Sequence, residues 1–151
     1  MNVWAGFTQR TGNLTRSLDC FEQFSQIAKQ LLQTEPDNQS FKNGLAISYS
    51  KLGETHASLG NLDTALGFYE NYLQLTKELF QDYPNNVSFK NGLAVSYEKL
   101  GSFYQQSENP DKAKEYFLLA KELWVQLTDS APQYVEFKNN LDWIERELSE
   151  L

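Results

Sequence analysis

Apolar residues recur at helical spacing along almost the whole chain. One run includes Leu45, Tyr49 and Leu52, and the next begins at Ala65 and continues through Tyr69. Residues three or four apart share one face of a helix, so each run predicts an amphipathic helix of about 20 residues. Glycine, asparagine or proline stands between the runs. The pattern therefore predicts an all-α protein.

The helical runs belong to an internal repeat. The block Phe41–Ala46 returns as Phe89–Ala94 and, in degraded form, as Phe137–Asp142, so both steps are 48 residues (89 minus 41 and 137 minus 89). The prolines at 36, 84 and 132 and the asparagines at 13, 61 and 109 keep the same step. Self-similarity at such a period is typical of helical repeat arrays. Each repeat is predicted to be a helical hairpin.

Short turn sequences define the ends of the predicted helices. Gly60 suits a left-handed helix end and Asn61 can cap the next helix, so this pair predicts the turn inside a hairpin. Gly12 and Asn13 are expected to make the same turn one step earlier. Between repeats, a proline ends one helix, and in two cases an asparagine starts the next.

The register divides the chain into a partial repeat (1–37), two repeats (38–85 and 86–133) and a final helix (134–151). Residues 1–12 read as half of a first helix, so the array begins in mid-repeat, as in a fragment or at the end of a longer array. The second helix, 14–34, is expected to bury an apolar stripe made of Leu18, Phe21, Phe24, Ile27 and Leu31. In the final helix, Asp142 and Glu145 replace an alanine and a tyrosine, which favours a capping helix.

The repeat landmarks resemble those of the tetratricopeptide repeat over nearly the whole chain. They are Leu52-Gly53, His56, Gly60, Ala65 and Tyr69, and then Leu100-Gly101, Tyr104, Ala113 and Phe117. That family's usual period is about 34 residues, so both helices of this long variant gain about two turns. The resemblance implies a right-handed α-α superhelix of about seven antiparallel helices, forming a single domain.

Composition excludes several classes of function. The net charge is −7, from 13 basic and 20 acidic residues, which argues against nucleic acid as a partner. No apolar run or secretion signal is visible, so no membrane association and a cytoplasmic location are expected. A single cysteine, Cys20, and a single histidine, His56, predict neither a metal site nor a cofactor. Cys20 is expected to be a small buried side chain and His56 to pack between two helices. Without a nucleophile and base, no enzyme is expected.

The resemblance also implies a concave groove lined by first-helix residues. The positions that match the family's groove are Ile47, Ser50, Glu54, Ala57, Val95, Glu98, Ser102, Gln105, Trp143 and Arg146. Lys51 and Lys99 are expected at the edge of the groove, and Asn43, Asn91 and Asn139 one to two turns away. Family members that clamp a carboxylate use lysine and asparagine where this chain has serine and glutamate, so that function is not expected. The mixture favours a peptide or helix with some basic and some apolar character. The asparagines either bridge neighbouring repeats or meet the ligand.

The leading hypothesis is therefore a non-catalytic protein–protein interaction module, a scaffold that binds a peptide or helical segment of a partner. Two alternatives stay open. The chain is a spacer or sensor arm of a larger signalling protein, or it is a self-associating repeat domain. A homodimer would form through an N-terminal face that carries Trp4, Phe7 and Leu14.

Overall fold

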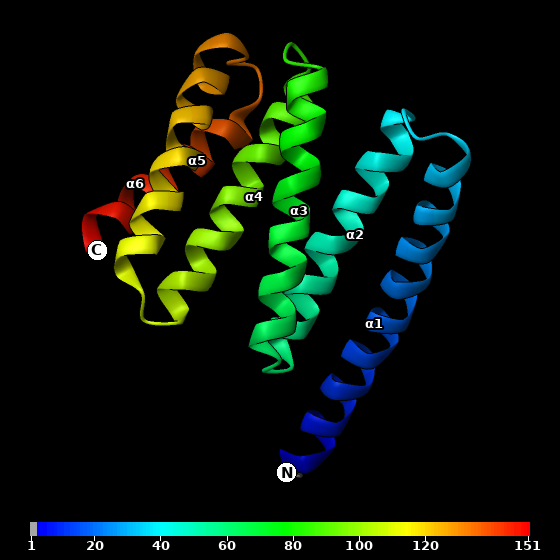
Figure 1. Cartoon of the computed structure of the whole chain (residues 1–151). Helices are drawn as coiled ribbons and strands as arrows, with labels where there is room; N and C mark the ends of the chain where they lie inside the picture. Colours follow the sequence, from blue (N-terminus) through cyan, green and yellow to red (C-terminus); the bar gives the residue numbers. More distant parts are fainter. Residues whose placement is uncertain (1–2) are drawn as a thin grey trace. The chain divides into compact units, whose positions relative to one another are not determined.

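The computed structural model describes the backbone of residues 3–151 and the side chains from residue 10 onward. This part of the chain forms six α-helices and no strand, consistent with a tetratricopeptide-like helical repeat, so the prediction of an all-α protein is confirmed. The helices are α1 (Val3–Thr34), α2 (Gln39–Ser58), α3 (Leu62–Asp82), α4 (Val87–Gln106), α5 (Pro110–Ser130) and α6 (Val135–Glu150) (Figure 1).

The chain divides within α3 into two compact units, Met1–Tyr72 and Leu73–Leu151, here called the N-terminal and C-terminal units. In the N-terminal unit, α1 and α2 lie side by side and run antiparallel. In the C-terminal unit, α4 and α5 form an antiparallel hairpin and α6 packs against α5 (Figure 1).

The expectation of seven helices is wrong for residues 3–151, because α1 continues without a break through Gly12 and Asn13. Within this helix, the hydroxyl of Ser17 donates to the backbone carbonyl of Asn13 at 3.0 Å. No described atom lies within 4 Å of the place where a side chain at Gly12 would begin. Among the described residues, no helix packs beside Gly12, so a turn at this position would place the chain against nothing. Continuing the helix keeps the backbone groups hydrogen-bonded. The predicted turn therefore does not form.

The other predicted turns form as expected. Gly60 has φ 81°, in the left-handed region. The side chain of Asn38 caps α2 by accepting from the backbone N–H groups of Ser40 and Phe41, and that of Asn86 caps α4 by accepting from the backbone N–H of Phe89. Glu108 stands one repeat step after Gly60 and has φ 57°, so a residue with a side chain takes the left-handed turn position there.

In each unit, an aromatic ring on one helix packs directly against a glycine on the neighbouring helix. In the N-terminal unit, a Cβ built on Gly53 would lie 2.6 Å from the ring of Tyr69. His56 stacks on Phe68 with ring centroids 5.4 Å apart, which confirms that it packs between two helices. Contacts this close exist only because the helix carries no side chain at the crossing point. The tyrosine and phenylalanine rings therefore fix how closely α2 and α3 approach.

The C-terminal unit repeats this packing and has a larger core. A Cβ built on Gly101 would lie 2.4 Å from the ring of Phe117, which is fully buried. Trp124 and Ile144 join the same buried cluster, which draws on α4, α5 and α6. The hydroxyl of Thr76 donates to that of Ser96 at 3.0 Å, so a buried polar pair between α3 and α4 is satisfied.

The second helix of one repeat joins the first helix of the next by a similar contact in each unit. Lys29 lies over the ring of Tyr49, 5.4 Å from its centroid, and one repeat step later Lys77 lies 5.8 Å from the centroid of Tyr97. At the third step a carboxylate, Glu145, replaces the tyrosine and pairs with Lys121 at 3.1 Å. The last joint is therefore an ion pair instead of a cation–π contact.

The apolar stripe of α1 is not buried as expected, because Leu18 and Phe21 are half-buried and the other three residues are exposed. Phe24 is 51% exposed, Ile27 is 55% exposed and Leu31 is 39% exposed, and Cys20 is also exposed. The side of α1 that is buried carries Ser25 and Ala28. In the part of the chain that the structure describes, no helix covers the stripe. Of the residues named for an N-terminal dimer face, Leu14 is half-buried, and the side chains of Trp4 and Phe7 lie outside the described residues.

Candidate functional site

Five of the residues predicted to line a groove lie on α2, in the N-terminal unit. Ile47 is 50% exposed, and Lys51 is exposed. Asn43 and Glu54 are half-buried. Ser50 is buried, at 7% exposure, so little of its side chain is accessible from solvent. Ile47, Lys51 and Glu54 are therefore the accessible members of this set.

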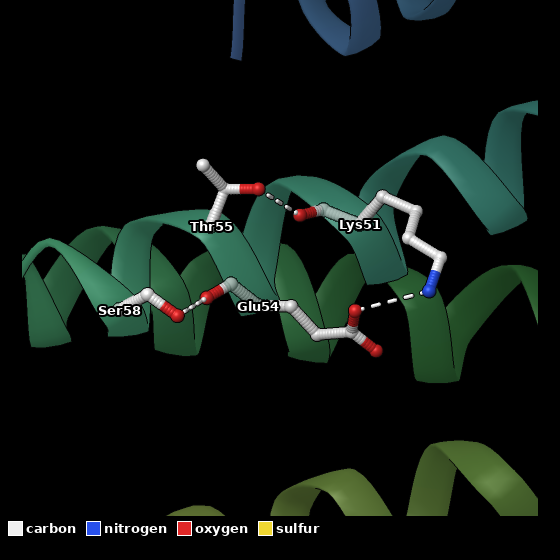
Figure 2. A network of polar contacts seen from close by, with 4 residues as sticks. All are labelled: Lys51, Glu54, Thr55 and Ser58. Atoms are coloured by element: carbon white, nitrogen blue, oxygen red, sulfur yellow. Dashed lines mark hydrogen bonds and ion pairs between the residues drawn. The ribbon is translucent and has the colours of Figure 1, made fainter. Parts of the chain in front are cut away.

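Lys51 and Glu54 pair with each other one turn apart. Lys51 Nζ lies 3.0 Å from Glu54 Oε2, and the hydroxyls of Thr55 and Ser58 donate to the backbone carbonyls of Lys51 and Glu54 (Figure 2). A pair this exposed contributes only about 0–1 kcal/mol to stability. The surface around this pair is locally almost neutral, because Lys51 offsets the charge of Glu54.

The charge of Glu54 also acts on a buried tyrosine of α3. Burial, with a smaller contribution from the charge of Glu54, raises the pKa of Tyr69 to about 12.

Six further predicted residues lie on α4, in the C-terminal unit. Asn91, Val95, Glu98, Lys99, Ser102 and Gln105 are all half-buried. The carbonyl oxygen of Asn91 accepts from the indole N–H of Trp124 at 3.1 Å, a bond between α4 and α5 within one repeat. Asn43 is half-buried and Asn139 is exposed, so the three repeat-equivalent asparagines do not share one environment. Asn91 therefore has a structural role in its own hairpin, which neither sequence-based alternative described.

The remaining predicted residues lie on α6. The ring of Trp143 meets that of Phe117 edge-on, with centroids 5.8 Å apart, and Arg146 and Asn139 are exposed. The amide of Gln105 donates to Glu147 Oε2 at 2.9 Å, which ties α4 to α6. Sequence reasoning did not name Glu147. Its place one helical turn after Trp143 is the signal that could have found it.

One repeat position is apolar and accessible on all three first helices. Ile47, Val95 and Trp143 are related by the 48-residue step (95 minus 47 and 143 minus 95). Ile47 is half exposed, and Val95 and Trp143 are half-buried. Glu54 and Glu98 lie on the same helices as the first two, so each unit combines an apolar side chain with a carboxylate.

The last basic residue of the repeated block is engaged in α6. Lys138 Nζ lies 2.8 Å from Asp142 Oδ1, and this hydrogen bond raises the pKa of Lys138. Among the described residues, no group of three or more His, Cys, Asp or Glu side chains lies together as metal ligands would. None of the described helices has both the length and the apolar character needed to cross a membrane.

Comparison with known proteins points to one kind of repeat. Two family models, both described as tetratricopeptide repeat, match residues 45–85 and 94–123. These matches support a tetratricopeptide-repeat family, whose members typically mediate protein–protein interaction and are typically non-catalytic. No curated protein matches the chain.

Solved structures show the same kind of fold. Five chains match, among them the crystal structure of BtubC (BKLC) from P. vanneervenii, with a TM-score of 0.59 and 21% sequence identity. The match covers 90% of this chain and 50% of that one, so the chain spans half the length of the structure it resembles. At this identity the likeness concerns the fold alone.

Proposed function

We propose that this chain is a non-catalytic protein–protein interaction module that binds a peptide or helical segment of a partner through its first helices, α2, α4 and α6. The observation that carries the proposal is the repeated apolar position formed by Ile47, Val95 and Trp143. Each of these side chains keeps part of its surface in solvent. Accessible apolar and aromatic side chains can anchor a partner segment on a recognition surface.

The charged residues of these helices favour a partner of mixed character. Glu98 on α4 favours basic residues in the partner, and Arg146 on α6 favours an acidic residue or a C-terminal carboxylate near the end of the array. The same proposal includes a right-handed superhelix that would align the three helices, and a cytoplasmic location.

Selection from a random peptide library on the immobilised chain tests this proposal. The expected result is a set of peptides that combines basic and apolar residues. Ile47→Glu and Glu98→Lys should each weaken their binding at least about tenfold, because the first places a charge at an anchor and the second reverses a complementary charge.

Leu118→Glu is the matched control, because Leu118 on α5 is also 50% exposed and is not one of the predicted groove residues. Circular dichroism and thermal melting would first establish that all the variants are folded. The proposal is wrong if no peptide family is enriched, or if Leu118→Glu weakens binding as much as Ile47→Glu does.

A further inference from the structure

A second apolar surface lies between α1 and α2 in the N-terminal unit. Two adjoining pockets of about 300 and 190 Å³ share Phe24 as a wall. Their main lining is Phe21, Phe24, Ile27 and Leu31 from α1 with Gly44 and Ile47 from α2, and no charged residue lines either pocket. We call this surface the α1–α2 groove. Only Ile47 is shared with the proposed peptide-binding surface.

The dimensions of this groove suit a helix. Phe21 and Leu31 are ten residues apart on α1, which corresponds to a length of about 15 Å, or nearly three helical turns. Phe24, Ile27 and Leu31 follow one another at helical spacing and all are exposed. An apolar channel of this length matches the i, i+3, i+7 anchors of an amphipathic helix.

The C-terminal unit shows what fills the equivalent groove. Two repeat steps after Phe21, Phe24 and Leu31 stand Phe117, Ala120 and Leu127 on α5, and all three are fully buried. They belong to a core that includes Ala94 of α4 and Ile144 of α6. In the first unit, the corresponding side chains have no such cover among the described residues.

The helix that packs there is α4, which runs antiparallel to α5. It meets Phe117 with Gly101 and contributes the fully buried Ala94 to the same core. These two small residues are seven apart, so they lie on the same face and let the helix approach closely. Trp143, the counterpart of Ile47, also packs edge-on against Phe117. Ile47 is smaller than Trp143 and half exposed, so it leaves a pocket open beside Phe21, where Trp143 covers Phe117.

We propose that the α1–α2 groove binds an amphipathic helix of another protein, antiparallel to α1, with one small residue facing Phe21, as Gly101 faces Phe117, and a second small residue seven positions earlier facing Ala28. This expectation follows from the C-terminal unit, where α4 packs small residues against the aromatic core that α5 and α6 share. Among the described helices, α2 forms one wall of the groove and α4 is packed in the C-terminal unit.

A labelled synthetic peptide of residues 86–109, which carries the α4 sequence with its caps, is the probe. Titrated against the full chain, it should bind saturably. A peptide with Ala94→Arg and Gly101→Arg should bind at least about tenfold more weakly, because it can no longer approach the aromatic rings. In the chain, Phe24→Glu and Ile27→Glu should weaken binding at least about tenfold, and Leu118→Glu, of matched exposure, should change it less than about twofold.

Cys20 reports where the peptide binds, because it lines the larger pocket and is exposed. Alkylation of Cys20 should slow at saturating peptide. The proposal is overturned if the peptide does not bind, if it binds without protecting Cys20, or if Phe24→Glu leaves binding unchanged. It is also overturned if the chain forms a dimer in sedimentation experiments that Phe24→Glu dissociates, because the groove would then hold a second copy. Failure of the peptide-library experiment would not affect these outcomes, since they depend on α1.

Discussion

Replacing Gly101 with alanine tests the close packing that sets the distance between α4 and α5. The added Cβ would lie 2.4 Å from Cδ1 and 2.5 Å from Cε1 of Phe117. The ring cannot move aside easily, because Phe117 is fully buried and Trp143 contacts it edge-on. The helix or the ring must shift, and neighbouring core side chains must shift with it.

The expected loss of stability is the difference of two effects. Overpacking a core by one carbon costs about 1–3 kcal/mol, and replacing glycine by alanine within a helix returns about 1 kcal/mol. We therefore expect Gly101→Ala to lower the free energy of unfolding by up to roughly 2 kcal/mol. For a chain of this size that corresponds to a decrease in Tm of up to roughly 8 °C.

Urea unfolding followed by circular dichroism measures this change. Gly67→Ala on α3 is the matched control, because nothing lies within 4 Å of its Cβ position. It should gain stability, by about 0.5–1 kcal/mol. Adding Phe117→Leu to Gly101→Ala should cost less than the two single changes together, since the smaller side chain relieves the clash. The reasoning fails if Gly101→Ala stabilises the protein as Gly67→Ala does.

Three further changes have defined outcomes. Glu108→Gly should raise the free energy of unfolding by about 1 kcal/mol in urea titrations, because a left-handed φ of 57° strains a residue with a side chain; an unchanged or lower value would contradict this. Asn91→Ala should lower it by about 1–3 kcal/mol and alter the tryptophan fluorescence, because the indole N–H of Trp124 loses its acceptor; equal stability would refute a structural role. The pKa of Tyr69 is raised to about 12 from 10.0, so its contribution to stability is complete below pH 10 and is lost as pH rises toward 12. The denaturation midpoint should therefore fall over this interval, and less so in Tyr69→Phe; identical pH profiles would count against it.

The helices could be predicted from sequence better than the turns could. Apolar spacing is a local property, so α2 to α6 lie where the pattern placed them. The turns depend on what packs nearby. Gly60 makes a left-handed turn, Gly12 at the equivalent position continues a helix, and Glu108 turns without being a glycine. The same repeat position thus has different conformations, because tertiary contacts and not the residue type alone select among them.

The candidate site was only partly accessible to sequence reasoning. The 48-residue register placed Ile47, Val95 and Trp143 at one repeat position, and the structure leaves each of them partly in solvent. The bond between Asn91 and Trp124 joins residues 33 apart, and such a pairing follows from helix packing that the sequence does not reveal. The exposed stripe of α1 was missed for a related reason. An apolar face predicts burial only when a covering element is present.

Within the C-terminal unit, the Lys77–Tyr97 contact and the Lys121–Glu145 ion pair occupy equivalent repeat positions but should differ in how strongly salt weakens them. Lys121 and Glu145 are 37% and 48% exposed, so added electrolyte screens their attraction, with a Debye length of about 8 Å at physiological ionic strength. The ring of Tyr97 is half-buried and contributes apolar contact as well as charge attraction to Lys77. We therefore expect amide hydrogens in α6 to exchange somewhat faster as ionic strength rises and those of α4 to respond less. The salt effect on opening of the C-terminal helix is limited to the about 0–1 kcal/mol that an exposed ion pair contributes.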